Sequence, residues 1–468
     1  MENKKKEIIT DFEYNPFRYK KIKDRFLIVN ESGSWIVLGK KKFDKLMRKE
    51  LDPKLFEDLT KKGIIITKNN INQILIDYAK RFEFLFKGAS LHIIVTTLRC
   101  NHKCIYCHSA AKDCDKKEFD MDLKTAKKTL EFIFQTPSNT ITIEFQGGEP
   151  LLNWGTFQFI VTEAKKMNLK FNKKIRFALV TNLTCLTEDQ LDWIQEQNID
   201  MCTSLDGPQE IHDHNRIYED KSGTYTAVTN KIKDVRSKGK RIAALMVTTR
   251  NSLSKHKEII DEYVDKGFKD IQIKYLNKLG FAQEKWNNDG YSIEEFIDFW
   301  EKSVEYIISL NKRGIFVRER YVVLILKKIL TKTDPSFLDF RSPCGLAIGQ
   351  IAYDHKGNIF SCDEGRNFDL FKLGNVFDNN YKEIINQKKT QQLISLSINS
   401  SFLCDNCVYK PYCGLCPVMN YAEEGNMIPK LSSNSKCKLF MFQFDYVFNK
   451  LLFEPESRKI LLNWLKYK

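Results

Sequence analysis

Three cysteines that lie close together in the chain could hold a metal centre. Cys100, Cys104 and Cys107 are separated by three and then two residues within one short segment. Three thiolates at this spacing can bind three corners of a cubane iron–sulfur cluster and leave the fourth iron open to a small molecule. A zinc site would need a fourth ligand, which His102 or His108 could supply. The lack of a fourth local cysteine favours the iron–sulfur cluster.

Seven more cysteines lie toward the end of the chain. They are Cys344, Cys362, Cys404, Cys407, Cys413, Cys416 and Cys437. Disulfides are not expected, because a reducing compartment keeps thiols reduced and clustered cysteines then bind metal by default. Two CxxC pairs within this group would suit a zinc knuckle as well as iron–sulfur clusters. Three isolated cysteines, Cys114, Cys185 and Cys202, are interpreted as core or surface thiols.

The chain of 468 residues has a formal charge of +15. Much of this charge comes from lysines at helical spacing, which is typical of solvated helix faces; attraction of an acidic partner is the alternative. No nucleic-acid motif is present, so a basic zinc protein that binds nucleic acid is kept only as a competing hypothesis. The first residues lack the apolar core of a signal peptide, and no apolar window of 18 residues exists. We therefore expect a cytoplasmic protein that contacts neither membrane nor nucleic acid.

Strand-like and helix-like segments alternate from residue 91 onward. The expected strands are 91–98, 141–146, 175–182, 200–206, 242–249 and 270–276, and helical stretches between them include 122–135, 187–197 and 254–266. Short apolar strands that alternate with helices predict parallel strands with right-handed crossovers. Six such units are too few for a closed barrel of eight. We therefore expect an α/β fold with a partial (β/α)6 barrel of the TIM type.

Residues suited to chemistry follow four of these strands directly. The first cysteine loop follows the first strand, Gly147-Gly148-Glu149 the second, Asn182 the third, and the segment 204–207 the fourth. Barrel enzymes keep their chemistry at the carboxyl ends of the strands. The sequence therefore predicts one site where these segments meet.

Two regions flank the predicted barrel, to which we assign residues 89–320. Residues 1–88 are typical of a small α+β module, and an exposed sheet edge there could bind an extended leader peptide by strand addition. The strands expected in this module are 25–30, 34–39 and 64–67. Residues 321–468 are cysteine-rich and lack long periodic segments, so we expect this region to fold around metal.

The loop from Cys100 to Cys107, with Tyr106 before its last cysteine, resembles the radical S-adenosylmethionine (SAM) superfamily. The resemblance implies a 4Fe–4S cluster whose open iron is chelated by the amino and carboxylate groups of SAM. One electron from the cluster then cleaves SAM to methionine and a 5′-deoxyadenosyl radical, which abstracts a hydrogen atom from the substrate. The protein supplies binding and orientation.

Two neighbouring motifs are similar to the SAM-binding motifs of that superfamily. Gln146-Gly147-Gly148-Glu149 resembles the GGE motif, in which the glycines let the backbone approach the ligand and the carboxylate accepts from the SAM ammonium. A glycine turn with a surface glutamate is the alternative.

Ser204-Leu205-Asp206-Gly207-Pro208, followed by His212 and Arg216, looks like the SxDG pattern of peptide-modifying members. The resemblance implies that Ser204 contacts the SAM ribose and that Arg216 contacts the SAM carboxylate. A surface ion pair is the alternative for Arg216, and a plain turn is the alternative for Asn182, which would otherwise contact SAM. Tyr106 packs by the adenine or covers the cluster. Asp206 is the candidate catalytic base.

The second cysteine region resembles the SPASM domain of peptide-maturing radical SAM enzymes, which carries two auxiliary 4Fe–4S clusters. The resemblance implies an outer cluster held by Cys404, Cys407, Cys413 and Cys437, and an inner cluster held by Cys344, Cys362 and Cys416. The spacing between the last two cysteines of the central run departs from the family, with two residues in place of three. Seven thiolates cannot fill eight corners, so the peptide or a nearby side chain is the hypothetical eighth ligand.

Longer strings, among them TLRCNHKCIYC (97–107), IEFQGGEPLLN (143–153) and PYCGLCPV (411–418), resemble the His-Xaa-Ser system radical SAM maturases. This resemblance implies an enzyme that modifies, by cross-linking, a ribosomally made precursor peptide with a leader. A flavodoxin or ferredoxin type of protein would supply single electrons. Members of this subgroup lack some of the auxiliary cysteines present here, at Cys344 and Cys362. The alternative function is formylglycine formation of the sulfatase-maturing type.

Overall fold

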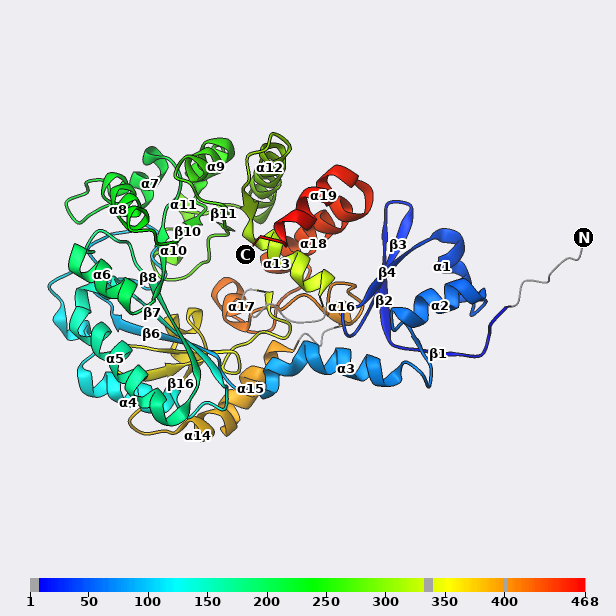
Figure 1. The fold of residues 1–468 in the computed structure, drawn as a ribbon, viewed down its shortest axis with the longest axis horizontal. Coiled ribbons are helices and arrows are strands. Elements are labelled where there is room, and N and C mark those ends of the chain that lie inside the picture. Colours follow the sequence, from blue (N-terminus) through cyan, green and yellow to red (C-terminus); the bar gives the residue numbers. More distant parts are fainter. Residues whose placement is uncertain (1–7, 332–339, 399–401, 468) are drawn as a thin grey trace, which may run out of the picture.

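The computed structural model describes residues 8–331, 340–398 and 402–467. A mostly parallel sheet of nine strands forms its centre, in the order β12-β10-β9-β8-β7-β6-β14-β15-β16, with helices along its outer face (Figure 1). Six of these strands are neighbours in chain order and run parallel: β6 (Leu91–Thr97), β7 (Thr140–Gly147), β8 (Lys174–Val180), β9 (Asp200–Ser204), β10 (Ile242–Val247) and β12 (Ile273–Lys274). The predicted α/β fold with a mostly parallel central sheet is confirmed.

The connections between these strands are helical, as the alternating pattern predicts. They include α4 (Leu123–Ile133), α5 (Trp154–Phe171), α6 (Glu188–Glu196), α7 (Gln209–Asn215), α8 (Tyr225–Ser237) and α9 (His256–Asp265). Local signals fix where they begin. The Asp122 carboxylate accepts from the backbone N–H of Thr125 at 2.6 Å and caps α4. Thr187 and Gln190 form a capping box at the start of α6.

The last predicted strand differs from expectation. Residues 270–276 divide into β11 (Asp270–Ile271) and β12, and β11 pairs in parallel with β13 (Arg318–Glu319), outside the main sheet. Further helices follow: α10 (Phe281–Glu284), α11 (Trp286–Asp289), α12 (Ile293–Lys312) and α13 (Arg320–Leu330). The predicted domain boundary at residue 320 thus falls at the first residue of α13.

The cysteine-rich region continues the central sheet. Its strand β14 (Gln350–Tyr353) pairs in parallel with β6, and β15 (Asn358–Phe360) and β16 (Lys372–Asn375) add antiparallel strands. Without β14, the strand that precedes the first cysteine loop would be an unprotected edge. The α-helices that follow are α14 (Tyr381–Asn386), α15 (Lys388–Ser397), α16 (Phe402–Asp405), α17 (Pro417–Glu424), α18 (Ser435–Phe453) and α19 (Pro455–Trp464).

The N-terminal module has a small core of its own, which includes Ile28, Leu38 and Leu55. Its elements are β1 (Glu13–Tyr14), β2 (Phe17–Ile22), β3 (Arg25–Asn30), β4 (Trp35–Gly39), α1 (Lys40–Met47), α2 (Pro53–Lys61) and β5 (Ile65–Ile66). Strands β2, β3 and β4 form an antiparallel sheet, and β5 pairs with β1. Strand β2 was not predicted, because its sequence FRYKKI carries three basic residues and little apolar alternation.

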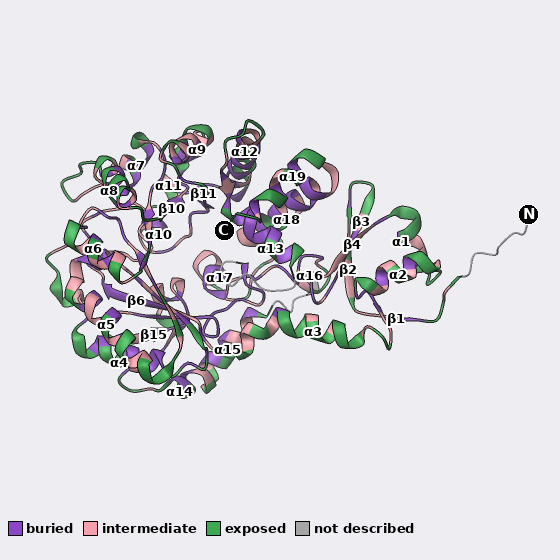
Figure 2. Cartoon of the chain, viewed as in Figure 1, coloured by how far each residue is buried: buried purple, intermediate pink, exposed green. Residues whose placement is uncertain are grey.

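Helix α3 (Ile71–Phe82) joins this module to the central sheet and is largely exposed (Figures 1 and 2). The module is held against the cysteine-rich region by polar contacts. The Arg81 guanidinium, which is buried, donates from Nε to the Pro411 carbonyl at 3.0 Å. The Tyr412 hydroxyl donates to the Gly33 carbonyl at 2.7 Å, and the Trp35 indole donates to the Ile329 carbonyl at 2.6 Å.

Replacing Arg81 with Met should loosen the module from the rest of the protein. The substitution removes charge-assisted hydrogen bonds and leaves a buried carbonyl unpaired, so we expect the free energy of unfolding to fall by roughly 2 to 4 kcal/mol. Denaturant unfolding would measure the change in free energy, and limited proteolysis of α3 would show whether the module has loosened. Lys80→Met, at the exposed neighbouring position, is the matched control and should change stability by less than about 0.5 kcal/mol. Equal stability of the two variants would show that Arg81 does not hold the module against the cysteine-rich region.

Candidate functional site

The first three cysteines lie in a loop that follows β6 and is fixed by backbone hydrogen bonds to distant segments. The N–H of Lys103 donates to the Ile217 carbonyl at 2.7 Å, and the N–H of Ile105 donates to the Asn215 carbonyl at 3.0 Å. Burial raises the pKa of the Cys104 thiol to about 11, and the nearby Cys107 thiol adds to this shift. A site of this kind favours thiolates only when a cation is bound, which suits a metal centre.

Gly147 and Gly148 allow the strand end of β7 to lie directly against this loop. The Gly148 N–H donates to the Thr97 carbonyl at 2.9 Å. A Cβ atom on Gly148 would lie 2.1 Å from the Arg99 carbonyl oxygen, and one on Gly147, whose φ is +143°, would lie 2.1 Å from the Thr97 oxygen. The glycines are therefore needed for contact with the cysteine loop itself, a reason that the sequence motif did not reveal.

Glu149 is fully buried and binds protein groups rather than facing solvent. Its carboxylate accepts from the N–H of Asn182 at 2.8 Å, from the Thr181 hydroxyl at 2.8 Å and from the N–H of Leu151 at 3.0 Å. Burial raises the pKa of this carboxyl to about 7. These contacts join the ends of β7 and β8, and they exclude the alternative of a surface glutamate.

Asp206 is fully buried at the end of β9 and accepts several hydrogen bonds. Its Oδ2 accepts from Arg216 Nε and from Asn215 Nδ2, both at 3.1 Å, and from the Tyr106 hydroxyl. Its Oδ1 accepts from the Val247 N–H at 3.1 Å. With both oxygens engaged and no exposure, the carboxylate is arranged to position its neighbours, and these contacts do not favour the role of catalytic base.

Arg216 connects Asp206 to the cysteine loop. Its guanidinium lies over the Tyr106 ring, 5.1 Å from the ring centroid, and its Nη1 lies 3.7 Å from the Cys104 sulfur. The side chain is buried rather than on the surface, so the alternative of a surface ion pair does not hold. A fixed cation beside the thiol stabilises negative charge there.

Asn182 and Ser204 lie on the same side of the sheet as the loop. The Asn182 amide donates to Asn101 Oδ1 at 2.8 Å and lies 3.8 Å from the Cys100 sulfur. Ser204 lines the cavity that these segments enclose. Asn182 is thus part of the support of the cysteine loop, beyond a plain turn residue.

A cavity of about 1050 Å³ connects the predicted residues. Its lining includes all of the expected cysteine-loop and SAM-contact positions except the buried Glu149: Cys100, Cys104, Cys107, Tyr106, Gln146, Gly147, Gly148, Asn182, Ser204 and Arg216. The structure therefore brings together segments that follow four different strands. This volume lies just above the usual range of about 300 to 1,000 Å³ for a site that binds one small molecule.

Two residues of this cavity were missed by sequence analysis. Asp363 follows Cys362 directly and lies 3.2 Å from His108 Nε2 of the cysteine loop, and its carboxylate accepts from Arg366 Nε at 3.0 Å. Although burial opposes the charged form, the Arg366 and His108 side chains hold the pKa of Asp363 well below its usual range. Glu144 on β7 also lines the cavity, and burial raises its pKa. The position of Asp363 next to a cysteine was the only signal available.

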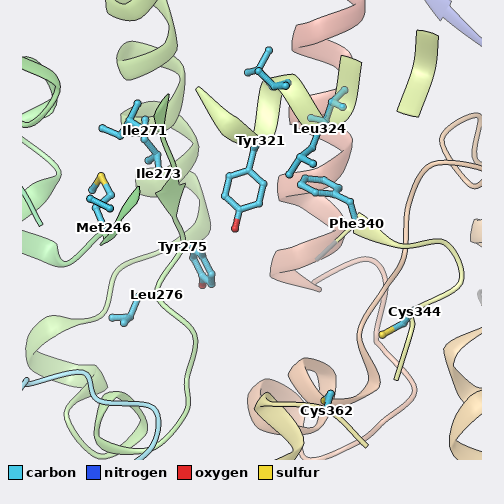
Figure 3. Packing of buried hydrophobic residues seen from close by; sticks show 14 of the residues in the cluster. Met246, Ile271, Ile273, Tyr275, Leu276, Tyr321, Leu324, Phe340, Cys344 and Cys362 are labelled. Carbon is cyan, nitrogen blue, oxygen red and sulfur yellow. The ribbon is translucent and has the colours of Figure 1, made fainter. Parts of the chain in front are cut away.

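The seven later cysteines fall into two groups. Cys344, Cys362 and Cys416 line a second, smaller cavity next to the first, and Tyr275 and Tyr321 line it too. Figure 3 shows Cys344 and Cys362 on separate segments. The other group comprises Cys404, Cys407, Cys413 and Cys437. Burial raises the pKa of the Cys413 thiol, and the three other thiols of its group add to the rise. This grouping matches the one that the resemblance implied.

The donor sets fit iron–sulfur clusters better than single zinc ions. Within residues 8–331, 340–398 and 402–467, no three His, Cys, Asp or Glu side chains converge closely enough to hold one metal ion. A zinc knuckle needs its thiolates within reach of a single ion at about 2.3 Å. A cubane binds each thiolate through a different iron, so its ligands stand further apart.

No helix of the described part of the chain is long and apolar enough to cross a bilayer.

Comparison with known proteins agrees with this site. Residues 94–276 match the family model described as the radical SAM superfamily. The cysteine-type anaerobic sulfatase-maturating enzyme of Clostridium novyi is 26% identical over 378 residues, which cover 79% of this chain and 98% of that protein. The radical SAM cyclopropyl synthase TigE of Paramaledivibacter caminithermalis is 23% identical over 77% of this chain and 76% of TigE.

Solved structures show the same fold. Native anSMEcpe with bound AdoMet has a TM-score of 0.67 at 22% identity, covering 80% of this chain and 100% of that chain. Streptococcus suis SuiB bound to its precursor peptide SuiA has a TM-score of 0.56 at 14% identity, covering 92% of this chain and 100% of that chain. Residues 94–276 therefore form a radical SAM domain, which implies a 4Fe–4S cluster and SAM. The protein is an enzyme, similar to anaerobic sulfatase-maturating enzymes in sequence and in fold.

Substituting Gly148 with Ala should displace the cysteine loop. The added Cβ would overlap the Arg99 carbonyl, so we expect a loss of roughly 1 to 3 kcal/mol in unfolding free energy together with reduced iron content after anaerobic reconstitution. Gly155→Ala is the control, because a Cβ there has no neighbour within 4 Å and should, if anything, stabilise α5 by up to about 1 kcal/mol. Full iron loading and unchanged stability in Gly148→Ala would show that the loop does not need this close approach.

Proposed function

We propose that this protein is a radical SAM maturase of the sulfatase-maturing type, which oxidises a cysteine or serine side chain of a peptide or protein to formylglycine. The observation that carries this proposal is the position of Asp363 in the wall of the large cavity. Its carboxylate lies 3.2 Å from His108 of the first cysteine loop, and it directly follows Cys362 of the inner group. Relatives described as cysteine-type and serine-type sulfatase-maturating enzymes support it.

The ten grouped cysteines would hold three 4Fe–4S clusters. Cys100, Cys104 and Cys107 would bind the first, next to SAM, and when bound this pair supplies a 5′-deoxyadenosyl radical that removes a hydrogen atom from the substrate. Tyr106, Gln146, Gly147, Gly148, Asn182, Ser204 and Arg216 line the space available to SAM. An external one-electron donor of the flavodoxin or ferredoxin type would supply the reducing electron.

Asp363 is our candidate base in place of Asp206. After a hydrogen atom is removed from the substrate β-carbon, the radical must lose one electron, and its thiol or hydroxyl group one proton, to complete a two-electron oxidation. Serine then gives the aldehyde directly, whereas the thioaldehyde formed from cysteine takes up water and releases hydrogen sulfide. The Asp363 carboxylate borders the cavity and stays ionised at neutral pH because Arg366 and His108 lower its pKa, so it can accept that proton. The adjacent residue, Cys362, belongs to the inner group of thiols. A cluster held by that group could accept the electron.

Cross-linking of a precursor peptide, as in the His-Xaa-Ser systems, is the second candidate function. Coverage of this chain rises from 80% with anSMEcpe to 92% with SuiB, whose structure contains its precursor peptide. The N-terminal module, residues 1–88, supplies a separate sheet in which β2 is an edge strand. An extended leader could add to this edge. Lys21 on β2 is exposed and would attract an acidic leader, whereas Arg18 and Lys20 already pair with Glu31 and Asp445.

Removing two ligands of the first cluster should abolish SAM cleavage and leave the other clusters intact. In a protein with Cys104→Ala and Cys107→Ala, we expect iron to fall from about twelve to about eight atoms per chain and reductive formation of 5′-deoxyadenosine to be lost. Iron analysis and chromatography of the nucleoside products would measure both. Cys114→Ala, which removes a thiol outside the three groups, should retain both properties. Retained SAM cleavage in the double variant would refute the assignment of the cluster.

The reaction can be identified with a matched pair of peptides that carry cysteine or serine at the target position. We expect an aldehyde that a hydrazine reagent traps, whereas cross-linking removes hydrogen without forming one. Asp363→Asn should retain SAM cleavage but lower aldehyde formation by about 10² to 10⁴-fold, since the proton acceptor is lost. Asp369→Asn, at an exposed position six residues further on, is the control and should behave like the parent. A hydrazine-inert product would replace the proposed function with the second candidate.

A further inference from the structure

The inner group of thiols lacks a fourth cysteine. Cys344, Cys362 and Cys416 line the smaller cavity, whereas a cubane has four irons to ligate. In the described part of the chain, no cysteine other than these three lines the smaller cavity. The fourth corner must therefore be met by a group other than a cysteine of this chain.

Gln350 stands at this corner. It closes the loop that begins at Cys344: the N–H groups of Gly349 and Gln350 both donate to the Gly345 carbonyl, at 2.6 and 3.2 Å. This turn brings the two ends of the loop, and thus Cys344 and Gln350, to the same cavity. Gln350 also lines the large cavity, so its side chain lies at the boundary between the two.

The amide of Gln350 has an unmet requirement for a partner. The residue is only 4% exposed, and its Oε1 has no hydrogen-bond partner. An unpaired buried amide oxygen destabilises the folded state, so such atoms are rare without a reason. An iron at the fourth corner of a cluster would provide the missing contact.

A neutral amide oxygen is a weak ligand for iron in a cluster. Soft thiolates are the preferred donors, whereas carbonyl oxygens suit harder cations. We propose that Gln350 is the fourth, exchangeable ligand of the inner auxiliary cluster, and that a thiolate arriving through the large cavity displaces it. The thiolate is either a free thiol or the cysteine of a peptide substrate. The inference rests on the auxiliary clusters of the proposed function.

Two neighbouring side chains are the competing ligands. Glu364 lines both cavities and lies close enough to raise the pKa of the Cys362 thiol through charge repulsion, after the larger effect of burial. Gln443 on α18 is also buried with an unpartnered Oε1, but it lines the smaller cavity alone. Because Gln350 is the one residue in the described ranges that combines an unpartnered oxygen with access from both cavities, it is the ligand that we assign.

The test uses the full chain with Cys100→Ala, Cys104→Ala and Cys107→Ala, so that only auxiliary clusters contribute to the signal. We expect about eight irons per chain. The dithionite-reduced protein is examined by electron paramagnetic resonance with and without 2-mercaptoethanol. The g-values of one of the two clusters should change on addition of the thiol. Adding Gln350→Cys, which supplies a fourth thiolate, should keep about eight irons and abolish the response.

Matched variants separate the competing ligands. Glu364→Gln and Gln443→Ala should each still respond to 2-mercaptoethanol. Loss of the response in Glu364→Gln, a persistent response in Gln350→Cys, or no response in the parent would each overturn the assignment of Gln350. Iron near four atoms per chain would instead overturn the two auxiliary clusters, and so the proposed function itself.

A peptide pair identifies the source of the thiolate. A cysteine-containing peptide should reproduce the change caused by 2-mercaptoethanol, and its serine counterpart should not. A change with both peptides would overturn thiolate ligation. A response to 2-mercaptoethanol alone, without a response to the cysteine peptide, would overturn the substrate as the ligand and support a free thiol.

Discussion

The site depends on one buried charge pair, Asp206 with Arg216. A carboxylate without solvent exposure is tolerable only because a guanidinium, an amide, a phenol and a backbone N–H all donate to it. These donors come from the cysteine loop, from α7 and its C-terminal end, and from β10. The pair therefore fixes three separate segments around the space where the cluster and SAM would lie, and it places the Arg216 cation beside the Cys104 sulfur.

The sheet joins the two cysteine-rich regions into one structural unit. Strand β14 pairs with β6, the strand that leads into the first cysteine loop, and Gln350 is the first residue of β14. The hairpin partner β15 then leads to Cys362 and Asp363. The inner thiols and the cavity carboxylate are thus positioned by the same hydrogen-bonded ladder as the first loop. This explains why the large and small cavities share a wall.

Much of this arrangement could be predicted from sequence. The spacing of the first three cysteines indicated the cluster loop, and alternating apolar segments predicted the parallel strands. The two later groups of cysteines were implied by the resemblance to the SPASM domain. The function was less accessible: the relatives support the sulfatase-maturing alternative better than the peptide cross-linking that we first favoured. The His-Xaa-Ser resemblance rested on short strings around the motifs, which related radical SAM enzymes share.

What sequence could not show depends on contacts between distant segments. The structural roles of Glu149 and Asp206 arise from donors up to 100 residues away. Sequence therefore suggested a SAM contact for Glu149 and a catalytic base for Asp206, and it showed neither structural role. The pairing of β14 with β6 joins residues more than 250 positions apart, beyond any local pattern. Asp363 was missed because a carboxylate beside a cysteine has no distinctive spacing. Strand β2 was missed because tertiary packing, not alternation, makes it a strand.

The contact between the N-terminal module and the residues before Cys413 has an evolutionary consequence. Arg81 and Gly33 bind the carbonyl of Pro411 and the hydroxyl of Tyr412, immediately ahead of an outer-group thiol. A module joined only by a flexible linker could be exchanged for another during evolution. Exchange of this module would also require changes in the segment that carries that thiol. Modules and auxiliary regions joined in this way should therefore be inherited together.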